Sequence, residues 1–167
     1  MKLDLGGARS IPPNNCLPDL LASLLLREPQ FVNFFPVFLS NLAERLGEAG
    51  MFADGLVTIK EAFDSAEARN EEWGLAEFAR IKGRLLFMAG MAAEAEFELM
   101  QAVELARRQG GLFWELRAAR NLAELRHAQG RTAEGCELLS AVCARFTEGF
   151  QSADFLAARK FLDDLAA

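Results

Sequence analysis

The sequence predicts an all-α solenoid of three helical hairpins with flanking helices, and three observations favour this fold. Glycines recur every 40 residues, at Gly50, Gly90 and Gly130. Small residues stand seven positions before and five positions after each of these glycines, where the two helices of a hairpin come close together. Apolar residues follow the i, i+3, i+4, i+7 spacing of a helix rather than the alternation of a strand. A repeat of this length is typical of stacked helical units that share a continuous core.

The three hairpins are expected at about residues 30–69, 71–109 and 112–148, each turning at its glycine. Polar residues between positions 69 and 73, and the glycine pair at 110 and 111, should separate one hairpin from the next. Pro36 would remove a hydrogen bond inside a helix that began near residue 30. The first helix therefore either bends at Pro36 or begins there.

The segments that flank the hairpins have different compositions. Residues 1–16, rich in glycine, proline and asparagine, are expected to form an irregular N-terminal arm, and residues 17–167 a single domain. Ser152 is the expected N-cap of a capping helix over residues 152–166. The apolar stripe of this helix should face inward and consists of Phe155, Ala158, Leu162 and Leu165. Residues 17–27 are the candidate cover for the opposite end of the stack.

Composition and charge narrow the classes of function. The 167 residues are 51% hydrophobic, enough for one folded domain, and the formal net charge of −6 argues against a nucleic-acid binder that relies on a globally basic field. One histidine and three cysteines provide few ligands for a metal site. An odd number of thiols without a disulfide framework suits a reducing cytoplasm. A signal peptide and a membrane-spanning run are not expected, so a membrane is not an expected partner. Because of the net negative charge, a nucleic acid is not an expected partner either.

Several segments carry a family resemblance: Pro36–Glu44, Arg80–Leu86, Trp114–Ala123 followed by Gln129-Gly130-Arg131, Phe146–Phe150 and Leu162–Leu165. These segments resemble the tetratricopeptide-like (TPR) repeats in the C-terminal part of bacterial proteins that join an adenylate/guanylate cyclase or DNA-binding domain to an AAA-type ATPase module. The resemblance covers about residues 30–165 and implies a helical-repeat fold with a role in protein interaction and signalling. The period of 40 residues exceeds the usual one of about 34. No phosphate-binding loop is found in the sequence, so the resemblance implies no catalysis.

The outward positions of the first helix of the second and third hairpins form the candidate partner-binding groove. They are Glu77, Arg80, Arg84, Phe87, Arg117, Arg120, Asn121, Glu124 and His127. The four arginines of this set form a predicted cationic cluster that can hold a carboxylate or an acidic peptide. In the alternative interpretation, Arg80 pairs with Glu77, Arg120 pairs with Glu124, and all four arginines only solvate the helix surface.

Two further hypotheses concern other residues. The phenylalanines of the first helix, Phe31, Phe34, Phe35 and Phe38, form a candidate dimer face, unless the preceding leucines cover them. His127 and Cys136 flank the turn at Gly130 and could approach each other, but no oxyanion site or third catalytic group is visible. The expected function is therefore a non-catalytic module that binds a protein or peptide partner and holds no cofactor or metal.

Overall fold

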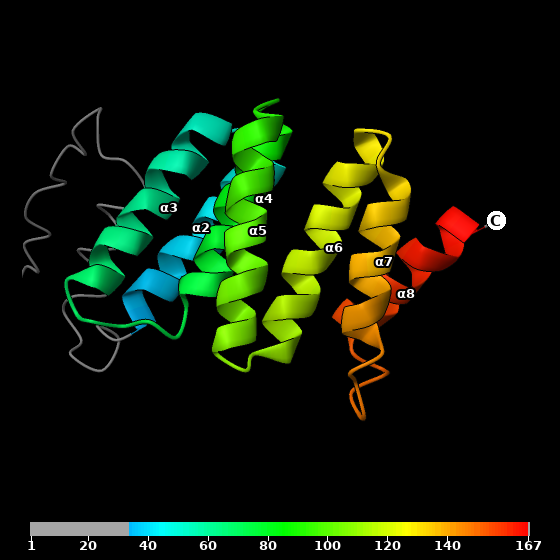
Figure 1. Cartoon of the computed structure of the whole chain (residues 1–167). Coiled ribbons are helices and arrows are strands. Elements are labelled where there is room, and N and C mark those ends of the chain that lie inside the picture. The colour runs from blue at the N-terminus through cyan, green and yellow to red at the C-terminus, as the bar shows by residue number, and fades with distance from the viewer. Residues whose placement is uncertain (1–33, 167) are drawn as a thin grey trace, which may run out of the picture. The chain divides into compact units, whose positions relative to one another are not determined.

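A computed structural model of the chain describes residues 34–166 (Figure 1). The chain divides into two compact units, residues 1–35 and 36–167; the described residues are the second unit up to residue 166 and the last two residues of the first, Phe34 and Phe35. In the described residues the fold is entirely helical, which confirms the all-α prediction. The helices are α2 (Phe35–Glu48), α3 (Phe52–Glu67), α4 (Leu75–Met88), α5 (Ala92–Arg108), α6 (Leu112–Ala128), α7 (Thr132–Cys143) and α8 (Ala153–Ala166). The predicted boundary between residues 16 and 17 lies outside the described residues.

The predicted turns at Gly50, Gly90 and Gly130 are confirmed. Their φ angles are 79°, 83° and 78°, in the left-handed region where a side chain would be strained. At the third turn, the backbone N–H of Arg131 donates to the carbonyl oxygen of Arg126 at 2.8 Å, which closes the end of α6 in the manner of a Schellman motif. Each glycine therefore ends one helix and allows the chain to reverse into the next.

The predicted close contacts between small residues are also present. A Cβ atom added at Gly135 would lie 3.0 Å from both the Cα and the carbonyl oxygen of Ala123. Cβ atoms at Gly55 and Gly83 would each lie 3.2 Å from a carbonyl oxygen of the facing helix. The contacting pairs are Ala43 with Gly55, Gly83 with Ala95, and Ala123 with Gly135. The same two positions of the period thus bring the two helices of each hairpin together.

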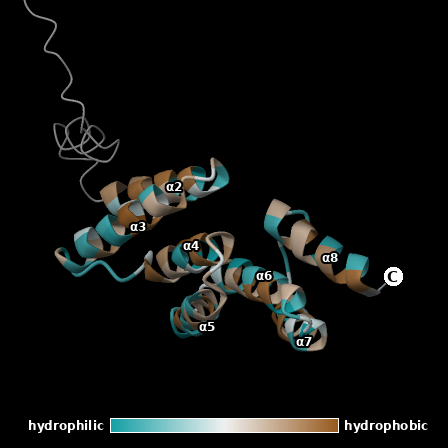
Figure 2. Cartoon of the chain, turned by 90° about the horizontal axis from the view of Figure 1, so that it is seen from above, coloured by the Kyte–Doolittle hydropathy of each residue, from teal (hydrophilic) through white to brown (hydrophobic). Residues whose placement is uncertain are grey.

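The segments between hairpins repeat with the same period. Asn70 and Gly110, 40 positions apart, both adopt positive φ angles, of 54° and 70°. The side-chain amide of Gln109 donates to the backbone oxygen of Glu72 at 2.6 Å and so connects two successive loops. The glycine turns lie at one end of the helices and these loops at the other (Figure 1). Helices α3, α5 and α7 lie on one side, and α2, α4 and α6 on the other (Figure 2).

The ends of the helices refine the sequence expectations. Helix α2 begins at Phe35, so Pro36 stands in its first turn, where the missing N–H of proline breaks no hydrogen bond of the helix. Of the two alternatives for Pro36, the structure thus has the one in which the helix begins there instead of bending there. The oxygen Oγ of Ser152 accepts a hydrogen bond from the N–H of Phe155 at 3.3 Å, which confirms the predicted N-cap of α8.

Helix α8 packs against α6 and α7. Its predicted stripe faces this contact, with Phe155 and Ala158 buried and Leu162 and Leu165 half-buried. The buried core continues through α5, α6 and α7. No helix within residues 34–166 combines the length and apolar character needed to cross a bilayer.

Candidate functional site

Helices α4 and α6 contact each other directly and carry every residue of the predicted groove. The structure therefore brings the predicted arginines together on one side of the molecule. Their surroundings differ from the prediction, because carboxylates from four helices lie among them. We call this set of side chains the arginine network; it comprises Glu44, Glu77, Arg80, Arg84, Arg117, Arg120, Asn121, Glu124 and Asp154.

Arg80 is the centre of the network. Its Nη2 lies 2.8 Å from Glu44 Oε1 of α2 and 2.8 Å from Glu77 Oε1 of its own helix. Its Nε donates to Glu77 Oε2 at 2.9 Å, and its Nη1 donates to Asn121 Oδ1 of α6 at 3.0 Å. One guanidinium thus connects the first helices of three successive hairpins.

Burial and charge act in opposite directions on the two central groups. Burial raises the pKa of Glu44, but the charge and hydrogen bond of Arg80 and the charges of Arg117 and Arg84 outweigh it, so this pKa lies below its ordinary value. Burial lowers the pKa of Arg80, but hydrogen bonds and charge from Glu77 and Glu44 raise it further than burial lowers it. Both groups are therefore charged at neutral pH and compensate each other inside the protein.

Two ion pairs join residues that stand exactly one period apart. Arg84 Nη1 lies 3.1 Å from Glu44 Oε1, and Arg117 Nη1 lies 2.6 Å from Glu77 Oε1. In each pair, the equivalent position carries opposite charge in successive hairpins. Sequence reasoning missed Glu44 because it searched for partners within one helix only. Aligning the repeats and comparing charges at equivalent positions would have found it.

The rest of the network follows the alternative interpretation for the sequence. Arg80 pairs with Glu77 three positions away, and Arg120 Nε lies 3.3 Å from Glu124 Oε1 four positions away. Asn121 Nδ2 donates to Glu124 Oε2 at 3.0 Å. Asp154 of α8, a second residue that the sequence analysis missed, lies 3.7 Å from Arg117 Nε, a contact with no regular spacing to reveal it.

The prediction that Arg80 faces solvent is therefore wrong. Its side chain is 2% exposed, because α4 is in contact with neighbours that bring acceptors to it from both sides. Asn121 is buried as well. Arg84 and Arg120 remain accessible, with 33% and 27% of their side chains exposed. Among the described residues, no hydrogen bond reaches Nη2 of Arg84 or either Nη of Arg120.

The remaining groove residues have other neighbours. Phe87 is half-buried against the hydrophobic core. His127 is exposed; its Nδ1 lies 2.9 Å from Thr132 Oγ1, and its ring meets Phe161 edge-on. Cys136 is half-buried, and within residues 34–166 no hydrogen bond joins its thiol to His127. The described residues also contain no group of three side chains suited to hold a metal ion.

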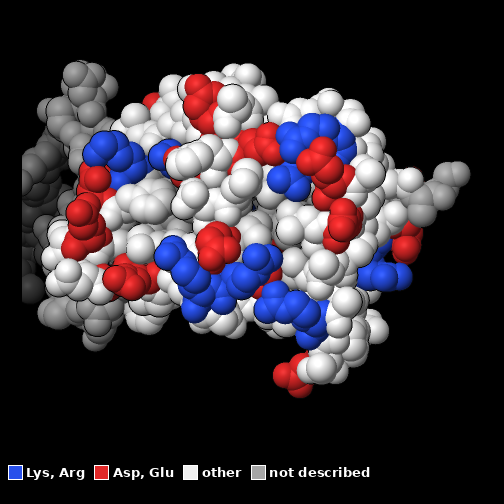
Figure 3. All heavy atoms as spheres, viewed as in Figure 1, with Lys and Arg blue, Asp and Glu red and all other residues white. Residues whose placement is uncertain are grey.

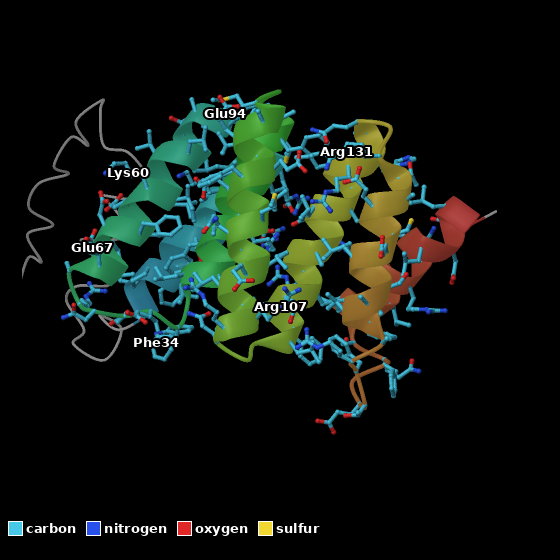
Figure 4. All side chains as sticks on the ribbon, in the orientation of Figure 1. Phe34, Lys60, Glu67, Glu94, Arg107 and Arg131 are labelled. Carbon is cyan, nitrogen blue, oxygen red and sulfur yellow. The ribbon has the colours of Figure 1, made fainter. Side chains whose placement is uncertain are left out.

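The candidate dimer face is only partly described. Phe34 and Phe38 are 53% and 39% exposed, whereas Phe35 is buried. Figure 4 labels Phe34 at the start of α2. Phe31 lies outside the described residues. The structure thus separates the phenylalanines of this face into two that are accessible and one that is not.

A second buried carboxylate, unforeseen from the sequence, lies on the side of α5 and α7. Glu115 is 1% exposed, and its Oε1 lies 3.1 Å from Arg107 Nε, while its Oε2 lies 2.6 Å from Arg145 Nη1. Arg107 lies toward the loop end of α5 (Figure 4), and basic and acidic atoms adjoin each other over this face (Figure 3). The side chains of Arg107 and Arg145 are half-exposed, whereas the side chain of Arg80 is buried.

Comparison of the chain with protein-family models, with curated proteins and with solved structures finds no match.

Proposed function

We propose that the chain is a non-catalytic protein-interaction module of the cytoplasm, built as a solenoid of TPR-like hairpins, which binds an acidic peptide segment along α4 and α6. The observation that carries this proposal is the pair Arg84 and Arg120. Both are accessible and keep unpaired donors, and they belong to successive hairpins on the same side of the molecule. The 40-residue recurrence of turns and close contacts supports the solenoid.

The buried part of the arginine network would hold the accessible part in place. Nη1 of Arg84 is anchored at 3.1 Å on Glu44, which is itself only 8% exposed. A side chain held in this way loses little conformational entropy when it binds a ligand. Its remaining N–H groups match the oxygens of a carboxylate. Phe87, one helical turn from Arg84, offers an adjoining apolar contact.

The test is a selection of peptides that bind the intact chain from a random twelve-residue display library. We expect the enriched peptides to contain several Asp or Glu residues. Binding of a selected peptide should weaken about thirtyfold or more in the double variant Arg84→Gln/Arg120→Gln, because each of the two lost charge-assisted hydrogen bonds costs about 1 kcal/mol or more. Fluorescence anisotropy with the labelled peptide measures the change.

The matched control removes two arginines elsewhere. Arg108 and Arg159 are exposed, and the variant Arg108→Gln/Arg159→Gln has the same net charge as the test variant. The control should bind the peptide as the wild type does. Enriched peptides without acidic residues, or equal loss in both variants, would contradict a specific site on α4 and α6.

A second candidate function is self-association through Phe34 and Phe38, which is favoured by the exposure of these two rings at the start of α2. In this case, light scattering after size exclusion should give twice the monomer mass, and Phe34→Ser/Phe38→Ser should restore the monomer. A wild-type chain that stays monomeric at about 100 μM, well above the dissociation constant of a stable dimer, would reject this candidate.

A further inference from the structure

The ends of the helices opposite the glycine turns carry an aromatic and acidic edge. A cavity of about 440 Å³ opens there, lined by Gly110, Phe113, Trp114, Phe146, Thr147 and Glu148. A smaller cavity, of about 280 Å³, lies at the preceding loop and includes Asn70, the equivalent of Gly110 one period earlier. The hydrogen bond from Gln109 to the backbone of Glu72 connects the two loops. The two cavities thus occupy one continuous edge.

Three aromatic rings, those of Phe113, Trp114 and Phe146, line the larger cavity. The ring of Phe113 meets the ring of Phe146 edge-on with centroids 5.1 Å apart. Trp114 is stacked with Trp73 of the preceding loop at 6.3 Å and an interplanar angle of 29°. Phe113 and Trp73 are both exposed. Both rings therefore offer accessible surface to a ligand, and the π face of an aromatic ring attracts cations.

The carboxylates of this edge are unpaired. Glu148 lines the larger cavity, and Glu67, Glu71 and Glu72 line the smaller one. Within the described part of the chain, no ion pair or hydrogen bond involves any of these four side chains. Arg145, which precedes Phe146 in the chain, is directed to Glu115 instead, as is Arg107. The edge thus combines aromatic rings with carboxylates that have no ion-pair partner among the described residues.

We propose that this edge binds a basic segment of a protein partner, with one Arg or Lys side chain lying over Phe113 and Trp114 and its charge balanced by Glu148. A cation placed there gains attraction from the rings and from the carboxylate together. A purely apolar occupant would cover Glu148 without compensating its charge, which is unfavourable. The charge of the edge therefore selects a cationic ligand over an apolar one. This surface shares no residue with the arginine network, and the inference does not depend on the proposed function.

The two tryptophans provide a direct readout, because the chain has only two, Trp73 and Trp114, and both lie on this edge. We would titrate the intact chain with the peptide acetyl-GRGRGRG-amide and follow tryptophan fluorescence. A saturable change in emission is expected, weakening as salt is added. The peptide acetyl-GQGQGQG-amide should give no such change. An absent response to the arginine peptide, or an equal response to the glutamine peptide, would overturn the proposal.

Two variants localise the response without removing a tryptophan. Glu148→Gln removes the carboxylate and Phe113→Leu removes one π face, and each should weaken binding of the arginine peptide about tenfold. Glu148 is exposed, so its substitution does not threaten folding. The matched control is Glu94→Gln, an exposed acid toward the opposite end of α5 (Figure 4), which should bind as the wild type does.

Undiminished affinity in both Glu148→Gln and Phe113→Leu would place the cation elsewhere and refute the inference. The variant Arg84→Gln/Arg120→Gln should retain full binding of the arginine peptide. Conversely, Glu148→Gln should retain binding of the acidic peptides selected on α4 and α6. The two proposals can thus fail separately.

Discussion

Replacing Glu44 with leucine should lower the free energy of unfolding by about 3 kcal/mol, because the change leaves the enclosed charge of Arg80 with one carboxylate fewer. Glu44 also accepts from Arg84 and lies 3.8 Å from Arg45 and 3.9 Å from Arg117, so four guanidinium groups lose a partner at once. Arg84 and Arg117 can turn toward water, but Arg80, at 2% exposure, cannot. The cost therefore comes mainly from Arg80. Urea unfolding followed by far-UV circular dichroism measures it.

The control for this variant is Glu48→Leu on the same helix. Glu48 is paired with Arg45 at 2.6 Å, but both side chains are accessible to solvent. Exposed ion pairs contribute about 0–1 kcal/mol, so Glu48→Leu should change stability by no more than this. Similar losses in Glu44→Leu and Glu48→Leu would contradict the enclosed network.

A double-mutant cycle with Arg80→Met separates the pair from its surroundings. Each single substitution leaves a charge without its partner, whereas Glu44→Leu/Arg80→Met removes both charges together. After the double change, Glu77 keeps Arg117 as a partner at 2.6 Å. The double variant should therefore lose at least about 1 kcal/mol less than the sum of the two single variants. Additive losses would mean that the two groups do not interact.

The pH dependence of stability gives a second view of the same carboxylate. The pKa of Glu44 is lower in the folded chain than its ordinary value of 4.5, so its contribution to stability is present above pH 4.5 and is lost as the pH falls through the folded value. In Glu44→Gln this contribution is absent at every pH. The loss of stability between pH 5 and pH 3, a range of about two units around the ordinary pKa, should thus be smaller in the variant than in the wild type.

The repeat itself was predictable from the sequence, because turns and close contacts depend on local rules. A left-handed turn favours glycine, and a close helix contact needs a small side chain, so Gly50, Gly90 and Gly130 and their small neighbours mark both features. Asn70 shows the limit of this reasoning. Its φ angle is positive like that of Gly110, but the residue itself did not predict this conformation. Only the polar residues around it predicted a boundary between two hairpins.

The arginine network could be predicted only in part, because its partners meet through space. Spacing within a helix correctly gave Arg80 with Glu77 as one alternative, but Glu44 lies 36 positions from Arg80. The charge of Arg80 also led to the wrong prediction that it faces solvent, since a charged residue in a helix normally lies on the solvent-exposed face. Arg80 is buried because acceptors from α2 and α6 meet it, and that depends on the packing of three hairpins.

The second large effect is expected at the contact between α6 and α7. Gly135→Leu should lower the free energy of unfolding by about 2–3 kcal/mol, because an oversized side chain in a packed contact forces the helices apart. Even the first carbon of the new side chain would lie 3.0 Å from the Cα and the carbonyl oxygen of Ala123. These are backbone atoms, and they can yield only if α6 itself moves.

The equivalent contact of the first hairpin shows why the nature of the neighbour matters. A Cβ atom at Gly55 would first meet Cδ2 of Leu85, at 2.8 Å, and a leucine methyl group can rotate away. The control for Gly135→Leu is Ala133→Leu, an exposed position on the same helix, which should change stability by no more than about 0.5 kcal/mol. Urea midpoints measured by circular dichroism compare the two variants. If both unfold at the same urea concentration, α6 and α7 do not make the backbone contact on which the hairpin depends.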